Sequence, residues 1–333
     1  MDLKKIECLL SGEPAFRIRQ IERSIYKDFN DNWNNFTGLP LTLREVLKKE
    51  IDLTIDGIIQ KSNNSGSLKA LIRLEDGTVV ETVLMSHIDN RNTVCVSSQA
   101  GCAAGCKFCK TGEMGFKRNL KPEEIIAQVL FFSRYLKTSG KRITNVVFMG
   151  MGEPFLNYDN FLSSVKILND ENKFNIGQRK ISVSTCGITE KIRMLADENI
   201  QINLAVSLNA PNDKIRMEIM PIAQKYPMNE LLSSVRYYIE KTNRRVMLEY
   251  VLLRGINDTA QNAEALVNKI RGLLCFVNLI PFNGEDNRKR PLESSIQEFK
   301  KILTANKTPF TQRYRFGEDI NAACGQLVFS KDI

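Results

Sequence analysis

The sequence predicts an α/β protein: a partial (β/α)6 TIM-like barrel that carries a small N-terminal domain of helices and a β-hairpin. From about residue 90 onward, short apolar runs of strand length alternate with amphipathic segments of helix length. Such apolar runs are typical of strands buried on both faces of a parallel sheet. Before that point, helical periodicity is followed by two apolar runs that meet at Asp76-Gly77, a favoured hairpin turn. We therefore expect one domain over residues 1–87 and a barrel core over residues 88–333.

The predicted elements follow in chain order. In the N-terminal domain, apolar residues recur at helical spacing over residues 15–29 and 41–50, and the hairpin covers residues 67–85. In the core, helices are predicted over residues 122–136, where Pro122 suits the first turn, and over 227–242. Six apolar runs predict the barrel strands: residues 92–98, 144–150, 180–185, 202–208, 245–252 and 276–281. Because parallel strands place their carboxyl ends together, we expect the functional site at that end of the barrel.

Composition limits the class of protein. With 333 residues and 43% hydrophobic content the chain can build a large core. No apolar run is long enough to span a membrane and the first twenty residues lack a secretory signal, so we expect a cytoplasmic protein without membrane contact. No repeated apolar seam calls for a second chain, so we expect a monomer. The net charge of +9 is compatible with a polyanionic partner.

The eight cysteines and the single histidine point to the kind of chemistry. In a reducing compartment, cysteines that cluster bind metal or react more often than they form structural disulfides. The chain has one histidine, His87, and this excludes most zinc sites built from histidines and most catalytic pairs of a nucleophile with a histidine.

Cys102, Cys106 and Cys109 form a C-x₃-C-x₂-C array directly after the first barrel strand. A structural zinc site and a saturated cubane iron–sulfur cluster both need four ligands, and a fourth nearby cysteine or histidine is missing. Three interpretations of the spacing remain open: a cluster with one exchangeable ligand position, a zinc site completed by a distant residue, and cysteines that only pack.

Other motifs follow the next strands. In "MGMGEP", Gly150 and Gly152 let the chain turn sharply beside a ligand, and Glu153 can accept hydrogen bonds from an ammonium group. On residue type alone, Cys95 in an apolar strand is a core cysteine. Cys324 stands among small residues, which is also consistent with close backbone packing. Three further cysteines are interpreted as core or surface residues: Cys8, Cys186 and Cys275.

Three long motifs, "CVSSQAGCAAGCKFCKTGEMGFKRNL", "MGMGEPFLNYDN" and "GEDINAACGQL", resemble the radical S-adenosylmethionine superfamily, and within it the RNA adenine C2 methyltransferases of the RlmN type. The resemblance implies one 4Fe-4S cluster on the three thiolates of the array, with S-adenosylmethionine chelating the fourth iron and two such molecules used per turnover. It also implies that Cys324 carries a methyl group, that Cys95 later forms a transient disulfide with it, and that Glu81 accepts a proton.

The resemblance further implies contacts to S-adenosylmethionine from seven residues: Gly152, Glu153, Ser184, Ser207, Leu208, Asn209 and Asn278. Two positions depart from the family pattern, which usually has histidine at Asn209 and serine at Cys186. The implied partners are 23S ribosomal RNA, tRNA and an external one-electron reductant of the flavodoxin or ferredoxin kind, and residues 1–87 become an accessory RNA-binding domain.

Basic residues suited to RNA phosphates fall in three groups, each of which is equally consistent with a solvated face. They are Arg17, Arg19 and Arg23; Lys117, Arg118 and Lys121; and Arg288, Lys289 and Arg290.

Two alternatives to C2 methylation remain. A Cfr-type enzyme methylates C8 of the same ribosomal adenine and gives antibiotic resistance, but such enzymes typically carry alanine where this chain has Pro154. A non-catalytic iron–sulfur protein that binds RNA is the second alternative.

Overall fold

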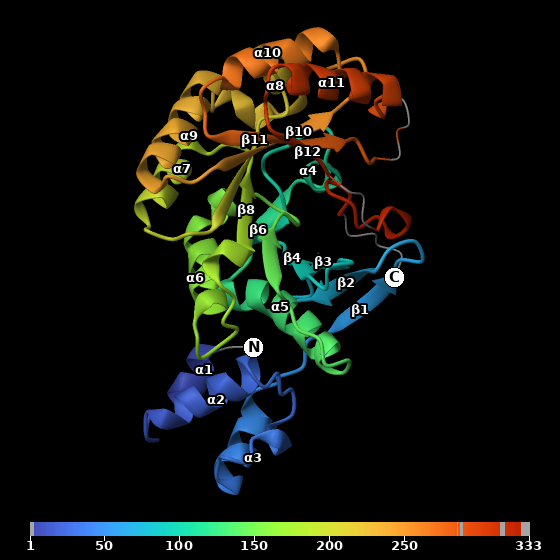
Figure 1. The fold of residues 1–333 in the computed structure, drawn as a ribbon. Coiled ribbons are helices and arrows are strands. Elements are labelled where there is room, and N and C mark those ends of the chain that lie inside the picture. Colours follow the sequence, from blue (N-terminus) through green and yellow to red (C-terminus); the bar gives the residue numbers. More distant parts are fainter. Residues whose placement is uncertain (1–2, 285, 287–288, 314–316, 328–333) are drawn as a thin grey trace.

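The computed structural model describes residues 3–284, 286, 289–313 and 317–327, and its centre is a ten-stranded sheet in the order β1-β2-β3-β4-β7-β8-β9-β10-β11-β12 (Figure 1). From β4 onward each neighbouring pair is parallel. These strands are β4 (Asn92–Cys95), β7 (Asn145–Phe148), β8 (Ile181–Thr185), β9 (Asn203–Ser207), β10 (Val246–Leu252), β11 (Cys275–Pro281) and β12 (Phe310–Gln312). All six predicted barrel strands are confirmed, and the short β12 was not predicted.

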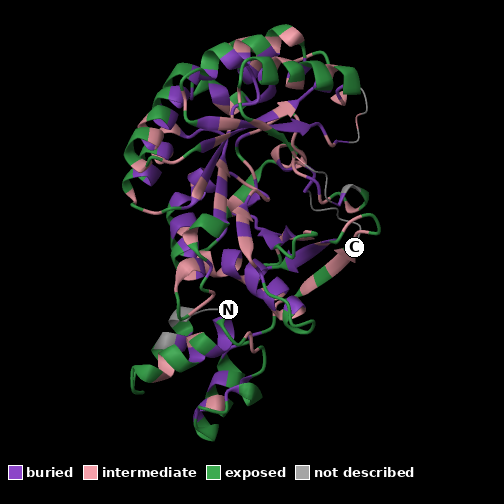
Figure 2. Cartoon of the chain, viewed as in Figure 1, coloured by how far each residue is buried: buried purple, intermediate pink, exposed green. Residues whose placement is uncertain are grey.

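An outer layer of helices covers the barrel strands, as Figure 1 shows. The helices are α5 (Pro122–Lys137), α6 (Tyr158–Asn169), α7 (Thr189–Asp197), α8 (Asp213–Ile219), α9 (Met228–Thr242), α10 (Ala260–Ile270) and α11 (Glu293–Ala305). Their apolar sides face the strands: Leu231, Val235 and Tyr238 of α9 are buried, while the opposite side of the helix is exposed (Figure 2). The partial (β/α)6 barrel is therefore confirmed, with the core between sheet and helices.

The N-terminal helices form a separate layer below the barrel in Figure 1. They are α1 (Leu3–Leu9), α2 (Phe16–Tyr26) and α3 (Leu41–Glu50). Tyr26 packs against Phe174 with ring centroids 5.4 Å apart, and the Arg134 guanidinium of α5 donates hydrogen bonds to the carbonyls of Asn30 and Leu53. These contacts fix the helices to the outside of the barrel.

The predicted hairpin is confirmed as β2 (Ser67–Arg73) and β3 (Val79–Ser86), joined through Gly77 with a φ of 79°. An additional strand, β1 (Gly57–Lys61), pairs with β2, and β3 pairs antiparallel with β4. The hairpin thus continues the barrel sheet, and the domain division at residue 87 stays a prediction.

Short elements complete the chain. A second sheet contains β5 (Gln99–Gly101) and β6 (Phe116–Asn119), and α4 (Lys110–Glu113) lies between them. No helix within the described ranges has the length and apolar character needed to cross a membrane.

Candidate active site

The three cysteines of the array lie on one loop, residues 102–109, which we call the cysteine loop. In the chain it comes directly after β5, which itself follows the carboxyl end of β4. Backbone hydrogen bonds fix the loop: the Cys102 N–H donates to Gly115 O at 2.9 Å, and the Lys107 N–H donates to Ile219 O at 3.0 Å. All three cysteines line one cavity of about 140 Å³, which we call the inner cavity. Burial raises the pKa of Cys102 to about 12.

The donor set of the inner cavity fits an iron–sulfur cluster. Thiolate is the preferred ligand of such clusters, and each thiolate binds a different iron, so the three sulfurs need not converge on one point. Within the described parts of the chain, no three cysteine, histidine or carboxylate side chains are grouped so as to hold a single metal ion. The cavity also contains the polar groups that a small zwitterionic molecule would need, as the next residues show.

Gly150, Gly152 and Glu153 form one wall of the inner cavity. A Cβ on Gly152 would lie 2.4 Å from the Gln99 side chain, and its φ is +97°, so only glycine fits this turn. The Glu153 carboxylate accepts hydrogen bonds from the N–H groups of Phe155 and Cys186. Burial nevertheless raises the pKa of Glu153. This buried carboxylate faces the cavity, as expected for a residue that would bind an ammonium group.

A second wall comes from the carboxyl ends of β8, β9 and β10. Ser184 and Ser207 both donate hydrogen bonds to the carboxylate of Glu249, a buried residue of β10. Asn209, with φ +56°, follows β9 and its side-chain oxygen accepts from the Val251 N–H at 2.9 Å. Five of the seven predicted contact residues therefore meet at the inner cavity: Gly152, Glu153, Ser184, Ser207 and Asn209.

Two other predicted contact residues lie differently. Leu208 is completely buried, and its backbone N–H donates to Glu249 O. Asn278, on β11, lines a different cavity and its side-chain oxygen accepts from the Thr311 hydroxyl at 3.0 Å. The contacts of both residues to S-adenosylmethionine stay predictions.

Cys95 and Cys324 come together although 229 positions separate them in the numbering. Both line a small pocket of about 30 Å³, which we call the thiol pocket. Burial raises the pKa of Cys95 to about 12 and also raises that of Cys324. The Arg313 guanidinium opposes the shift of both thiols, and its Nη1 lies 3.7 Å from Cys324 Sγ. The two thiols thus share one pocket with the Arg313 guanidinium beside them.

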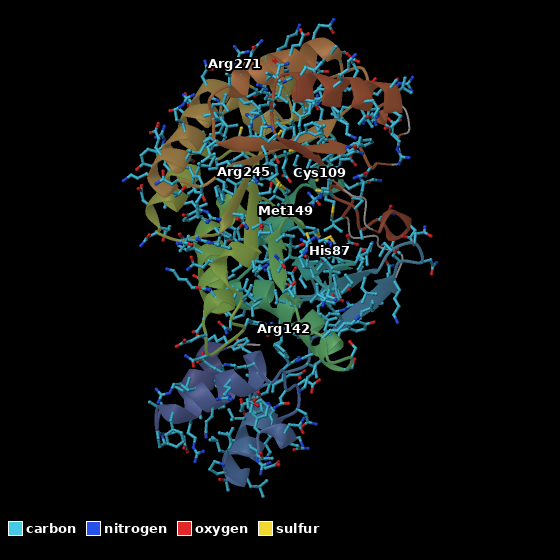
Figure 3. All side chains as sticks on the ribbon, viewed as in Figure 1. His87, Cys109, Arg142, Met149, Arg245 and Arg271 are labelled. Atoms are coloured by element: carbon cyan, nitrogen blue, oxygen red, sulfur yellow. The ribbon has the colours of Figure 1, made fainter. Side chains whose placement is uncertain are left out.

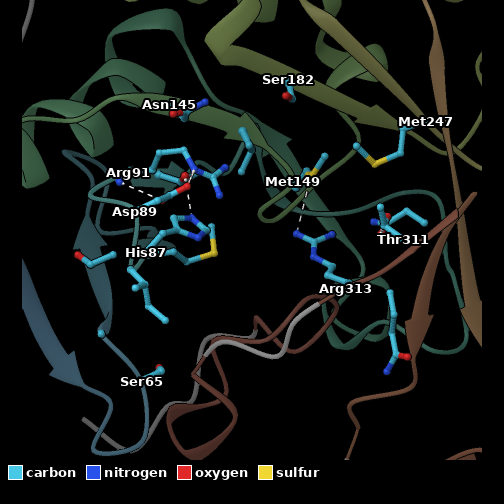
Figure 4. Close-up of a pocket in the computed structure, with 18 of the residues that line it drawn as sticks. Ser65, His87, Asp89, Arg91, Asn145, Met149, Ser182, Met247, Thr311 and Arg313 are labelled. Atoms are coloured by element: carbon cyan, nitrogen blue, oxygen red, sulfur yellow. Dashed lines mark hydrogen bonds and ion pairs between the residues drawn. The ribbon is translucent and has the colours of Figure 1, made fainter. Parts of the chain in front are cut away.

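A large open cavity of about 1000 Å³, which we call the outer cavity, adjoins the thiol pocket and shares Met85, Met149 and Arg313 with it (Figure 4). Polar side chains around it include Ser65, His87, Asp89, Arg91, Asn145, Ser182 and Thr311. Met149 and Arg313 face one another at the border of the thiol pocket and the outer cavity, with Arg313 Nη2 3.7 Å from Met149 Sδ. Cys109, Met149 and His87 follow one another from the cysteine loop toward the hairpin (Figure 3).

The segment that carries Cys324 is held from two sides. On one side it is bound by the β1–β2 loop. The Ser62 hydroxyl donates a hydrogen bond to Asp319 Oδ1 at 2.7 Å, and the Asn63 N–H donates to Asp319 Oδ2 at 2.8 Å. On the other side the segment contacts α4, where the Lys110 N–H donates a hydrogen bond to Gly325 O at 2.8 Å. These contacts place Cys324 at both the inner cavity and the thiol pocket.

Glu81 lies apart from these cavities. It is buried on β3, and its carboxylate forms an ion pair with Lys69 Nζ at 3.0 Å. Its role as proton acceptor stays a prediction.

Some of the predicted RNA-binding cations are already engaged. Arg118 forms ion pairs with Asp76 at 2.7 Å and with Glu124 at 2.8 Å, so it serves the protein's own structure. Lys117 is exposed, and Arg288 lies outside the described residues.

Sequence reasoning missed two residues of the site, Glu249 and Arg313. Glu249 was detectable as a carboxylate inside the apolar run "RVMLEYVL". Arg313 follows β12, and the sequence around it carries no motif; only the folded chain brings it to within 3.3 Å of Glu249.

Comparisons with known proteins agree with this geometry. The family model of the Radical SAM superfamily matches residues 96–267. A probable dual-specificity RNA methyltransferase RlmN of Clostridium novyi is 46% identical over 321 residues, which is 95% of this chain and 92% of that protein. A relative with the same description from Staphylococcus aureus is 43% identical, covering 95% of this chain and 87% of its own length.

The fold agrees as well. The crystal structure of a radical SAM methyltransferase from Sphaerobacter thermophilus superimposes with a TM-score of 0.93, at 45% identity, over 98% of this chain and 97% of that one. The chain therefore belongs to the radical SAM superfamily and, within it, to the RlmN family of dual-specificity RNA methyltransferases.

Proposed function

We propose that this chain methylates C2 of adenine in RNA through a methyl group carried on Cys324. The observation that carries the proposal is the position of the thiol pocket. It shares Met149 and Cys324 with the inner cavity, and Met149 and Arg313 with the outer cavity. A thiol in that position can receive a group from a small molecule on one side and pass it to a base on the other.

Membership of the superfamily implies two cofactors, one 4Fe-4S cluster and S-adenosylmethionine. We propose Cys102, Cys106 and Cys109, which line the inner cavity together, as the ligands of the cluster. When bound, they supply the one-electron chemistry that activates a methyl group for attack on the electron-poor C2 carbon. We propose that two S-adenosylmethionine molecules are used per turnover, one as methyl donor and one as radical source. Glu153 would hold the methionyl ammonium, because its carboxylate faces the same cavity as the three thiols.

The chain's own residues then act in sequence. The Cys324 sulfur forms a bond to the methyl carbon as the donor sulfonium bond breaks, and Arg313 favours the thiolate needed for this step. One hydrogen atom of the methyl group would be removed by the radical source, and the carbon would then join C2. The adduct would lose one electron, which the oxidised cluster would accept, and the C2 proton, for which Glu81 is the proposed acceptor, so that the RNA is tied to Cys324. Attack of the Cys95 thiolate on the Cys324 sulfur would break the sulfur–carbon bond and form a disulfide, and the carbon would take up a proton and remain on the base as the methyl group.

Restoring the two thiols requires two electrons, and starting the radical step requires another, so we propose an external reductant of the flavodoxin or ferredoxin kind. The outer cavity, at about 1000 Å³, has room for an extruded base, and base-modifying enzymes commonly act on bases taken out of the stack. We propose two substrates, adenine 2503 of 23S ribosomal RNA and adenine 37 of tRNA. We also propose that the chain acts in the cytoplasm as a monomer.

The test is to load the chain with its cluster anaerobically and incubate it with unmodified 23S ribosomal RNA or tRNA, S-adenosylmethionine and reductant. Nucleosides from the digested RNA are then identified by mass spectrometry. We expect 2-methyladenosine from the wild-type chain and none from Cys324→Ala. Cys275→Ala is the matched control and should keep its activity, because this buried thiol lines neither the thiol pocket nor the inner cavity.

Formation of 8-methyladenosine would overturn the assignment to C2 and favour Cfr-type chemistry. Absence of both products from cluster-loaded protein would favour the non-catalytic alternative.

A further inference from the structure

Arg216 is a fully buried arginine on α8, the helix that contacts the cysteine loop, and it forms no ion pair with an acid in the part of the chain that the structure describes. Its side chain is 0% exposed. Nη1 donates a hydrogen bond to Tyr226 O at 2.8 Å and Nη2 donates to Cys186 O at 2.6 Å, whereas Nε has no partner. Both accepting groups are neutral carbonyls, and the ion pairs found among the described residues include none to Arg216. Among the described residues the guanidinium therefore forms no ion pair, and Asp213, three residues earlier on α8, acts on it only through space.

A buried charge of this kind is unusual, because taking an ion out of water costs several kcal/mol unless an opposite charge compensates it. Arginine cannot relieve the cost by losing its proton, since its pKa stays above the physiological range. An anion that is not part of the polypeptide would complete the arrangement.

The position of Arg216 indicates which anion that is. The Lys107 N–H of the cysteine loop donates to Ile219 O, one turn after Arg216 on the same helix. The residue that accepts from Nη2, Cys186, uses its own N–H to bind Glu153, a wall of the inner cavity. Arg216 also interacts electrostatically with the Cys106 thiol of the cysteine loop, which agrees with this placement. Thiolate-bound clusters are anionic, and the cysteine loop would place one beside the guanidinium.

We propose that Arg216 is the internal counter-charge of the iron–sulfur cluster, a positioning residue that makes the cluster easier to reduce. The proposal rests on the cluster assigned above. Reduction adds one electron to the cluster, and a fixed cation stabilises the more negative state more strongly. Because the residue is buried, neither water nor salt screens the interaction as it would at the surface. Charge and hydrogen bonding around the sulfurs are established means by which a protein sets a cluster potential.

The test is a redox titration of the reconstituted full chain without RNA, with the reduced cluster measured by electron paramagnetic resonance. We compare wild type with Arg216→Gln, which removes the charge, and Arg216→Lys, which keeps it. In Arg216→Gln we expect the ratio of reduced to oxidised cluster at a fixed potential to fall at least about tenfold, equivalent to about 59 mV for one electron. In Arg216→Lys the ratio should stay within about threefold of wild type.

Lys107→Gln is the matched control, because it removes a cation from the cysteine loop itself but from an exposed position. Its charge is screened by water, so we expect a smaller change than for Arg216→Gln. Equal potentials for wild type and a cluster-loaded Arg216→Gln would overturn the proposal, as would equal shifts for Arg216→Gln and Lys107→Gln.

Loss of Arg216 could also disturb folding, since two carbonyls lose their donor. Arg216→His then serves as a second variant, because its charge can be switched by pH in one and the same fold. We expect its midpoint potential to fall more steeply with rising pH than that of wild type, and parallel curves would contradict the proposal. If Arg216→Lys were the one variant to retain iron and sulfide, the need for a positive charge beside the cluster would be supported. Loss of the cluster from all three Arg216 variants would instead show that the residue has a structural role and would overturn the proposal. Absence of a cluster from wild type would instead contradict the proposed function itself.

Discussion

Asn257 connects the fold to the inner cavity, and replacing it by alanine should weaken both. Its side chain is completely buried after β10. Nδ2 donates hydrogen bonds to Asn209 O and Val251 O, each at 2.7 Å, and Oδ1 accepts from the Leu253 N–H at 2.6 Å. One amide therefore holds the turn at Asn209, whose φ of +56° is otherwise unfavourable, against the end of β10.

The size of the effect follows from these three bonds. Asn257→Ala leaves three backbone groups without this partner, two of them buried and that of Val251 half-buried. Each such loss costs about 1–3 kcal/mol, so we expect about 4 kcal/mol of lost stability. With an unfolding entropy of about 2.1 cal/mol/K per residue, the 333-residue chain should melt about 6 °C lower. The turn at Asn209 should also lose its position, and we expect the Kd for S-adenosylmethionine to rise about tenfold, which is about 1.4 kcal/mol.

Two measurements check the reasoning: thermal melting of the metal-free protein and equilibrium binding of S-adenosylmethionine to the cluster-loaded protein. Asn262→Ala is the control, because the Asn262 amide makes one weak hydrogen bond of 3.4 Å, to Ile256 O. A melting temperature of Asn257→Ala equal to that of the control would refute the energetic argument. Reduced stability with unchanged S-adenosylmethionine affinity would show that Asn257 supports the fold but not the Asn209 turn.

Three further predictions concern the thiols and the segment that carries one of them. Cys95→Ala should accumulate RNA covalently bound to the protein, since no second thiol remains to release it; denaturing gels would show the adduct, and multiple turnovers by this variant would contradict the proposed role. Asp319→Ala should slow methylation several-fold with little change in melting temperature, because it frees the Cys324 segment from Ser62; an unchanged rate would mean that the contact to α4 suffices. Burial raises the pKa of Cys95 to about 12, so the stability that the neutral thiol contributes is complete below its unfolded pKa of about 9 and is lost as pH rises toward 12. The melting temperature of the metal-free wild type should therefore decrease more between pH 8 and about 11 than that of Cys95→Ala. Equal decreases in the two proteins would contradict this.

The sequence predicted the barrel because its strands are local signals. Residues 144–150 and 245–252 are apolar runs bounded by polar turns, and the structure turns both into parallel strands, β7 and β10. The hairpin could be predicted in the same way, because the turn residues Asp76-Gly77 separate two apolar runs of strand length. In contrast, β12 has three residues, and its pairing with β11 depends on a surface that the rest of the barrel must first create.

The sequence by itself determined the cysteine array, the glycine turn before Glu153 and the presence of two further thiols, because spacing along the chain encodes each of them. Only the tertiary structure decided that Cys95 and Cys324 share one pocket between two cavities, and that Arg313 lies beside them. It also decided that Arg118 pairs with Asp76 and Glu124, and that Arg216 is buried with no ion pair to any described residue. The physical reason is that burial and electrostatic partnership depend on chain segments far apart in sequence, which approach one another only when the barrel and its C-terminal segment have packed.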